Sequence, residues 1–378
     1  MRKIVAIGLA VVLVVGIGIA IVISSGATKH KTVTVTGLSG SEKLPYLTDP
    51  RVAKRLKELG IVLDVEPAGS REIATKYDLT KYDFAFPAGV PSAQAIKQRY
   101  KPAFPPYSVF YTPMAIATFA PIAKILVANK IAFVQGGTYY LDVKKYLDLV
   151  EQNVKWSDLK ASKAYPVDKS VVITSTDVRS SNSAAMYLSL SSYVANGDNV
   201  VRSEAQANVI QPLMTDIFLK QGFVASTSEE PFNDYLTIGA GKSPLVMIYE
   251  SQFVGAAANP QGGVQKSMVL MYPSPTVLSK HTFVPLTANG DKLGKALTND
   301  PQLQQLAVEY GFRTSQPGAF QKFTTEHGIK VPGSILNTVD PPSYETLEHM
   351  ITRIEAAYSA QNGGAASTTT TGTTTTQP

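Results

Sequence analysis

The pattern of apolar and polar positions predicts strands that alternate with helices. Residues 171–173 are β-branched and apolar, which suits a buried strand. A polar loop at 174–182 follows this run. Residues 183–188 then carry good helix formers and apolar side chains at spacings of three and four, as a helix does. We centre the functional prediction on this strand, loop and helix.

The polar loop before this helix carries several groups suited to an anionic or oxygen-rich ligand. The first N–H groups of a helix lack backbone partners and carry a partial positive charge. Arg179 supplies a planar guanidinium, and Asp177 either orients it or bonds its own loop backbone. Further donors follow at Ser180, Ser181, Asn182 and Ser183. In the alternative interpretation, Asn182 or Ser183 only caps the helix and Arg179 forms a surface ion pair.

Similar polar loops follow three predicted strands in the N-terminal part of the chain. The strands are expected at 32–36, 61–65 and 82–86. The loops lie at 37–43, 68–71 and 87–89. Strands that alternate with helices predict a mostly parallel sheet, and such sheets bind ligands at the carboxyl ends of their strands. We therefore expect these loops to gather at one edge.

Two extended segments predict a hinge between two lobes. The segment at 109–118 leads the chain into a second lobe, and the segment at 268–286 returns it. A pair of such crossings lets a cleft close around a solute. The prediction is an α/β protein whose first lobe comprises residues 32–114 and 270–361 and whose second comprises residues 115–269. Amphipathic helices near 301–310 and 343–358 belong to the first lobe in this assignment.

The two ends of the chain predict a membrane segment and a tail. Residues 4–23 form an uninterrupted apolar run, which fits a membrane span of about 20 residues. We expect residues 1–31 to be an uncleaved signal anchor, with the globular part outside the cytoplasm. The alternative is a signal sequence cut near 24–27, which would release the protein. Residues 362–378 are rich in Gly, Ala, Ser and Thr and predict a disordered tail.

Composition narrows the range of functions. The chain of 378 residues is 44% hydrophobic and 17% charged, as in ordinary globular proteins. Its net charge of +6 is mild and its basic residues are scattered, so no nucleic-acid partner is expected. The absence of cysteine excludes disulfides, thiolate metal sites and a cysteine nucleophile. No histidine pair has metal spacing, and no cofactor is predicted.

Several sequence segments resemble the type 2 periplasmic solute-binding proteins, in particular the phosphate, sulfate and molybdate receptors. They are GLSGSEK, YDFAFPAG, VRSSNSAAMYLSLSSYV, MIYESQ and MYPSPTVLSKHTFVPL. The resemblance covers about residues 32–358. Arg179 stands where phosphate receptors have an arginine before an Asp-Gly-Ser-Gly-Thr loop. Here the glycines and the aspartate of that loop are replaced, and residues with side chains keep a ligand farther from the backbone.

The resemblance implies a two-lobed receptor that delivers a small solute to an ABC permease, or that senses it. The implied ligand-binding residues are Ser39, Gly40, Ser41, Ser70, Arg71, Arg179, Ser180, Ser181, Asn182, Ser183, Glu250 and Ser251. An anionic solute is compatible with Glu250 only if that carboxylate accepts a proton from the solute or pairs with Arg179. A plain structural ion pair or helix cap is the alternative for Glu250.

Two other functions stay open from the sequence. One is a cell-surface module that binds a partner protein and takes up no solute, which a closed or filled cleft would favour. The other is a hydrolase that uses Ser39 or Ser41, which requires a base within hydrogen-bonding reach. The histidines of the chain are His30, His281, His327 and His349. His281 lies in the return crossing, where we expect a hinge hydrogen-bond donor or a surface residue rather than a base.

Overall fold

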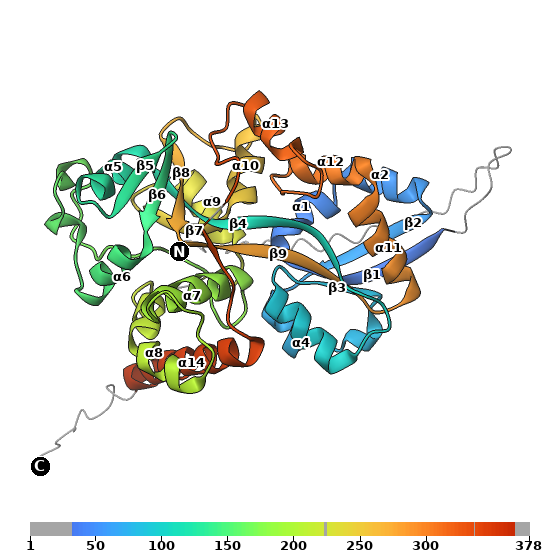
Figure 1. Ribbon diagram of the computed structural model, residues 1–378, viewed down its shortest axis with the longest axis horizontal. Coiled ribbons are helices and arrows are strands. Elements are labelled where there is room, and N and C mark those ends of the chain that lie inside the picture. Colours follow the sequence, from blue (N-terminus) through green and yellow to red (C-terminus); the bar gives the residue numbers. More distant parts are fainter. Residues whose placement is uncertain (1–31, 223–224, 336, 367–378) are drawn as a thin grey trace, which may run out of the picture. The chain divides into compact units, whose positions relative to one another are not determined.

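The computed structural model describes residues 32–222, 225–335 and 337–366, which form a mixed α/β fold (Figure 1). The predicted membrane segment at 4–23 and its cleavage alternative lie outside the described residues. Within the part of the chain that is described, no helix combines the length and apolar character needed to cross a membrane.

Helices and strands alternate along much of the chain. The strands are β1 (Val33–Ser39), β2 (Ile61–Pro67), β3 (Phe84–Phe86), β4 (Tyr107–Phe119), β5 (Ala132–Gln135), β6 (Thr138–Asp142), β7 (Leu245–Tyr249), β8 (Met268–Ser274), β9 (Thr276–Pro285) and β10 (Thr338–Val339). The α-helices are α1 (Leu44–Leu47), α2 (Pro50–Glu58), α3 (Ser70–Thr75), α4 (Val90–Tyr100), α5 (Ala120–Ala128), α6 (Val143–Glu151), α7 (Asn182–Ala195), α8 (Glu204–Leu219), α9 (Glu229–Thr237), α10 (Glu250–Ala258), α11 (Ala288–Asn299), α12 (Pro301–Glu309), α13 (Ala319–Glu326) and α14 (Tyr344–Ala366). Short 3₁₀ turns are η1 (Ser41–Lys43), η2 (Leu79–Lys81), η3 (Trp156–Asp158) and η4 (Ser162–Ala164).

The sheet is mixed rather than mostly parallel. Its strand order is β2-β1-β3-β9-β4-β8-β6-β5, with β7 paired to β4 and β10 to β9. The pairs β1–β2, β1–β3, β6–β8 and β9–β10 are parallel, whereas β4 and β9 run antiparallel to each other. The prediction of a mostly parallel sheet is therefore wrong at its centre, because one long strand leads the chain across and the other leads it back.

Strands β4 and β9 occupy the two predicted crossings. They pair from Tyr107 opposite Phe283 to Pro113 opposite Leu278. Beyond this stretch β4 no longer pairs with β9 and pairs with β7 and β8 instead. Figure 1 shows both strands running between the β1–β3 part of the sheet and the part that holds β7 and β8. Two long strands thus connect the two ends of the sheet.

The stretch 171–173, predicted to be a strand, is buried but lies outside the sheet. Ile173 is only 1% exposed. Its backbone N–H donates to the hydroxyl of Tyr146 (3.0 Å), and a single parallel bridge joins Thr174 to Val246. The apolar pattern predicted burial of this stretch correctly, but its backbone bonds the Tyr146 side chain and makes one isolated bridge instead of forming a strand. The helix predicted to follow is present as α7.

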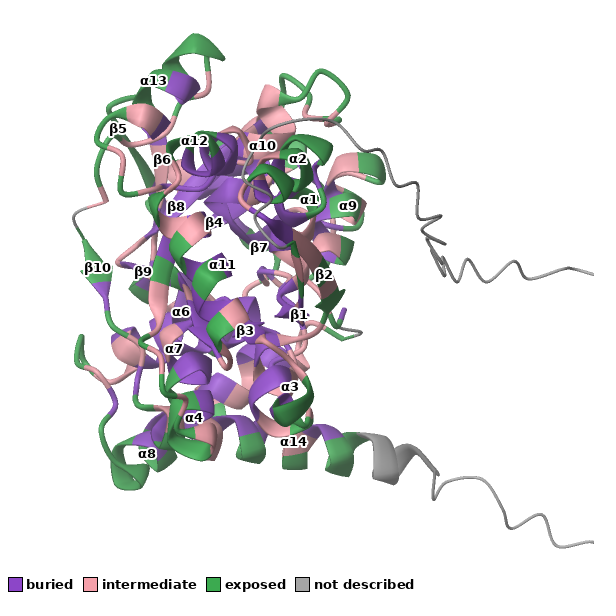
Figure 2. Cartoon of the chain, turned by 90° about the vertical axis from the view of Figure 1, so that its right-hand side faces the viewer, coloured by how far each residue is buried: buried purple, intermediate pink, exposed green. Residues whose placement is uncertain are grey.

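Apolar side chains gather in separate clusters on the two sides of β4 and β9. The largest cluster joins the end of β4 and strands β7 and β8 to α5, α6, α7 and α8. Two smaller clusters surround β1 and β3, with contributions from α2, α4, α11 and α12. Figure 2 shows buried residues concentrated on the strands and on the helix faces turned toward them.

Helix α14 packs against α8, a helix of the predicted second lobe. The segment 343–358 was assigned to the first lobe, yet Leu347, Met350 and Ile354 lie in the largest cluster, where α14 packs against α8. The amphipathic pattern of 343–358 predicted that one side of this helix is buried. It could not identify α8 as the helix that covers that side. The helix also continues to Ala366, so the predicted tail boundary after residue 361 is too early. Residues 367–378 lie outside the described part.

Candidate functional site

The loop after β1 turns two charged side chains into the interior. Strand β1 ends at the fully buried Ser39, and Gly40 precedes η1. A Cβ atom on Gly40 would lie 2.6 Å from Oε2 of Glu42 and 2.8 Å from Nζ of Lys43, so a larger residue here would displace these two side chains. Ser41 is half-buried at the start of η1. The sequence reasoning chose the small residues of this loop and missed the two charged ones.

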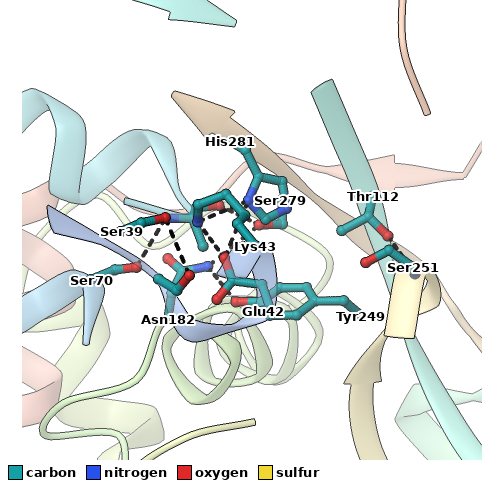
Figure 3. A network of polar contacts seen from close by, with 12 residues as sticks. Ser39, Glu42, Lys43, Ser70, Thr112, Asn182, Tyr249, Ser251, Ser279 and His281 are labelled. Carbon is teal, nitrogen blue, oxygen red and sulfur yellow. Dashed lines mark hydrogen bonds and ion pairs between the residues drawn. The ribbon is translucent and has the colours of Figure 1, made fainter. Parts of the chain in front are cut away.

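Glu42, Lys43 and His281 form a buried polar cluster (Figure 3). The ammonium of Lys43, whose side chain is fully buried, pairs with the carboxylate of Glu42. Nδ1 of His281, on β9, lies 3.4 Å from Nζ of Lys43 and 3.4 Å from Oε1 of Glu42. His281 lies on β9, within the predicted return crossing, and the surface alternative is wrong because its exposed fraction is 0%.

The three groups of the cluster shift one another's pKa values. Burial acts to raise the pKa of Glu42, but the charge of Lys43 and the contact with His281 lower it to about 2. Burial lowers the pKa of Lys43, and the charge of Glu42 opposes this. Burial and the charge of Lys43 lower the pKa of His281 to about 4. Nε2 of His281 has no hydrogen-bond partner among the described residues.

A second set of polar contacts joins the start of α7 to the loop after β3. Nδ2 of Asn182 donates to the hydroxyl of Tyr249 (3.0 Å) and lies 3.5 Å from Oγ of Ser279. Ser279 in turn donates to the carbonyl of Ala88. A Cβ atom on Gly89 would lie 2.2 Å from Oδ1 of Asn182. The predicted residue Asn182 thus meets the predicted loop at 87–89 across the molecule.

The two predicted arginines are held by carboxylates of the chain itself. Arg179 forms a bidentate pair with Asp177 (2.8 and 2.6 Å), and its guanidinium lies 4.9 Å from the ring centre of Tyr358. The interpretation in which Asp177 orients Arg179 is confirmed. Arg71 forms a bidentate pair with Glu348 of α14 (2.8 Å for each nitrogen). Within the described chain, therefore, both guanidinium groups are already paired.

The loops that carry these arginines touch each other through their backbones. The N–H of Arg71 donates to the carbonyl of Ser180 (3.3 Å), and its Nη1 donates to the carbonyl of Arg179 (2.8 Å). A Cβ atom on Gly69 would lie 2.6 Å from the Ser180 oxygen. The side chain of Ser180 lies near the Asp177 carbonyl (3.4 Å). The two predicted loops are in contact, as the prediction of a shared site requires.

The hydroxyl groups of Ser70, Ser181 and Ser183 bond to the protein. Oγ of Ser70 accepts the N–H of Ala88 (2.9 Å). The hydroxyls of Ser181 and Ser183 bond each other (3.1 Å), and Ser183 also bonds Thr176 (2.7 Å). These serines stabilise the loops in their present arrangement.

Glu250 forms an ion pair that the sequence reasoning assigned to the wrong arginine. Its fully buried carboxylate accepts Nε and Nη2 of Arg313 (2.7 and 2.9 Å) and the hydroxyl of Tyr272 (2.6 Å). The hypothesis of a pair with Arg179 is wrong, and the plain ion-pair interpretation of Glu250 is correct. The sequence around Arg313 does not predict this pair, because Glu250 lies 63 positions earlier in the chain.

A cavity of about 290 Å³ opens beside the buried cluster. Its lining comes from η1, α1, α9, α10 and the residues just after α10 and α12. It comprises Glu42, Pro45, Glu229, Phe232, Asn233, Leu236, Ser251, Gln252, Gly255, Ala256, Asn259, Gly262 and Tyr310. Ser251 is 2% exposed, and its backbone N–H donates to Oγ1 of Thr112 (3.1 Å). Among the described residues its hydroxyl has no partner. Of the predicted residues, Ser251 reaches this cavity, and Glu42 joins the cavity to the cluster.

The predicted hydrolase residues lack a base in the described chain. Ser39 donates its hydroxyl to the carbonyl of Gly40 (3.3 Å). No histidine or carboxylate side chain in the described ranges is hydrogen-bonded to Ser39 or Ser41, and His281 contacts Glu42 instead. Within the same ranges, no group of three or more acidic or histidine side chains is arranged to hold a metal ion.

Comparison with known proteins reveals likeness in structure. Neither a protein-family model nor a curated protein matches the chain. The sulfate-binding protein SubI from Mycobacterium tuberculosis is 16% identical with a TM-score of 0.51, over 83% of this chain and 96% of that one. A periplasmic thiamin-binding protein is 14% identical with a TM-score of 0.56, over 89% of this chain and 99% of that one. The chain therefore has the fold of the type 2 periplasmic solute-binding proteins.

Proposed function

We propose that this protein is an extracytoplasmic receptor that captures a small polar solute in a cleft between two lobes and delivers it to an ABC importer. The single observation that carries the proposal is the cavity beside Glu42, whose lining joins η1 and α1, which follow β1, to α9 and α10, which flank β7. The fold shared with sulfate- and thiamin-binding proteins supports it. The apolar segment at 4–23 would anchor the receptor to the membrane.

In this proposal the first lobe contains β1–β3 and the second contains the largest apolar cluster together with α14. Strands β4 and β9 form the hinge. Closing the lobes brings the loop at Gly69 against Ser180 and sets Asn182 against Gly89. The closed form gains these contacts only when the lobes meet, so a solute that fits the cleft stabilises closure.

The predicted binding residues divide into two roles under this proposal. Ser251 and the loop that contains Ser39, Gly40 and Ser41 face or support the cavity. The loop from Arg179 to Ser183 acts mainly in closure, because its side chains already bond within the protein. A predicted oxyanion would need a cation, and both predicted arginines are paired with carboxylates. We expect no catalytic step at this site.

A surface module that binds a partner protein is the second candidate, and one observation favours it. The loop at Arg71 and the loop at Ser180 are already in contact, and the side chain of Lys43 is fully buried. A module of this kind would hold no solute, whereas a receptor would retain one. This difference separates the two functions.

Native mass spectrometry of the full-length protein, purified in a mild detergent, tests the proposal. We expect a small molecule to be retained, and we expect Asn182→Ala to lower its affinity at least tenfold in calorimetry, because Asn182 links both lobes. Asn199→Ala alters an exposed asparagine beyond the other end of α7 and should change affinity less than twofold. A wild-type protein that retains no molecule, or equal affinity of all three proteins, would refute the receptor.

A further inference from the structure

We infer that the captured solute is an organic cation, a small molecule whose ammonium group binds between Glu42 and Glu229 while its apolar part fills the cavity. This inference rests on the proposed receptor function and names the solute class of the same site. It replaces the anionic solute that the sequence suggested. Four features of the cavity support it, namely its charge, an unpaired hydroxyl, its apolar lining residues and its size.

The charge of the lining is negative. Glu42 and Glu229 both contribute to the wall, and no lysine or arginine does. Lys43 already offsets the charge of Glu42. In the described chain, no hydrogen bond or ion pair joins another residue to the carboxylate of Glu229. Burial and then the charge of Glu42 raise the pKa of Glu229, so the two carboxylates interact with each other. A cation would relieve this repulsion, and an anion would increase it.

The hydroxyl of Ser251 is a second and independent feature. It is buried and belongs to the lining, and it has no hydrogen-bond partner in the described part of the chain. An ammonium group carries three N–H donors and needs several acceptors when it leaves water. Glu42 lies in η1, Glu229 at the start of α9 and Ser251 in α10, so the acidic pair and the unpaired hydroxyl come from three different elements around the cavity.

The rest of the lining includes apolar side chains. Phe232, Leu236 and Ala256 belong to it, as do Pro45 and Tyr310. Such side chains favour a hydrocarbon or a ring over water, and aromatic faces also attract cations. A bare metal ion would gain nothing from these residues, since hard cations prefer a shell of oxygen ligands.

The size of the cavity sets a limit on the solute. Its volume of about 290 Å³ lies near the lower end of small-molecule sites, which begin at about 300 Å³. One small ring or a short branched chain with an amine fits this space. A peptide or an oligosaccharide does not.

The test compares three probes of matched size, namely benzylamine, benzyl alcohol and benzoate, with the full-length protein in calorimetry at neutral pH. We expect benzylamine to bind most tightly and benzoate most weakly. Glu229→Gln should lower the affinity for benzylamine at least tenfold while leaving benzyl alcohol within about twofold. Glu230→Gln is the matched control, because Glu230 is the exposed neighbour in the same first turn of α9.

The outcomes separate the solute class from the receptor function. Equal or tighter binding of benzoate or benzyl alcohol overturns the cation, as does an unchanged affinity of Glu229→Gln for benzylamine. If no probe binds, the charge of the molecule retained in native mass spectrometry decides. A retained cation supports the inference, and a retained neutral or anionic molecule overturns it while the receptor stands. If no probe binds and no molecule is retained, both proposals fail.

Discussion

The buried His281 should make the stability of the protein fall in mildly acidic solution. Its ring is fully buried, with Lys43 and Glu42 within reach of Nδ1 and the ring of Phe110 5.3 Å away. The pKa of His281 is about 4 in the folded protein, against a value of 6.5 for the free side chain. Because the folded pKa is the lower one, the unfolded chain binds the proton first as the pH decreases. Stability is therefore complete above about pH 6.5 and decreases toward pH 4.

The size of this loss follows from the two pKa values. Each unit of difference corresponds to about 1.4 kcal/mol, so the free energy of unfolding should decrease by about 2 kcal/mol between pH 7.5 and 5, and by about 3 kcal/mol at pH 4. Glu42 contributes in a lower range. Its pKa is lowered from 4.5 to about 2, so the stability that its charge provides is lost only below about pH 4.5.

Urea unfolding at a series of pH values measures this loss. The single tryptophan, Trp156, is buried and reports unfolding by fluorescence, and circular dichroism gives a second signal. His281→Gln should remove most of the decrease between pH 6.5 and 5, whereas His327→Gln, which replaces an exposed histidine, should retain it. If His281→Gln and the wild type lose the same free energy in this range, the argument from burial of His281 is refuted.

Two further substitutions test the contacts around the site. Arg313→Met should lower the free energy of unfolding, measured in urea, by about 3–5 kcal/mol, because Glu250 then stays buried without its partner. Adding Glu250→Gln should restore part of this loss. A loss below about 1 kcal/mol for Arg313→Met would contradict the importance of the pair. Gly89→Ala should weaken solute binding at least tenfold in calorimetry, since its Cβ would lie 2.2 Å from Oδ1 of Asn182. Gly241→Ala, with no atom within 4 Å, is the control, and equal affinity of the two variants would show that the loops do not need this close contact.

The local elements of the fold were accessible from the sequence because their signals are local. The apolar spacing at 183–188 predicted α7, which spans Asn182–Ala195. The alternating run at 32–36 predicted β1, and small polar residues marked the loop after it. The extended segment at 109–118 predicted the long strand β4. In each case the period of the pattern and the turn residues lie within one short segment.

The partners of charged side chains were not accessible from the sequence. Arg179 pairs with a near neighbour, and this contact was anticipated. Glu250 instead finds Arg313, 63 positions away, and Lys43 meets His281, 238 positions away. Such pairs form only when β4 and β9 bring distant segments together. No spacing rule connects them along the chain.

The sequence by itself determined the class of the fold, the polar loops and several helices, among them α7, α12 and α14, since backbone preferences and apolar periodicity act over a few residues. Tertiary structure decided which helix covers α14, whether the run at 171–173 joins the sheet, and which carboxylate holds each arginine. It also decided the charge around the cavity, where Lys43 is buried against Glu42 and the predicted arginines pair elsewhere. Burial and pairing depend on three-dimensional contacts between distant residues, because an ionised group must find its partner wherever the fold places it.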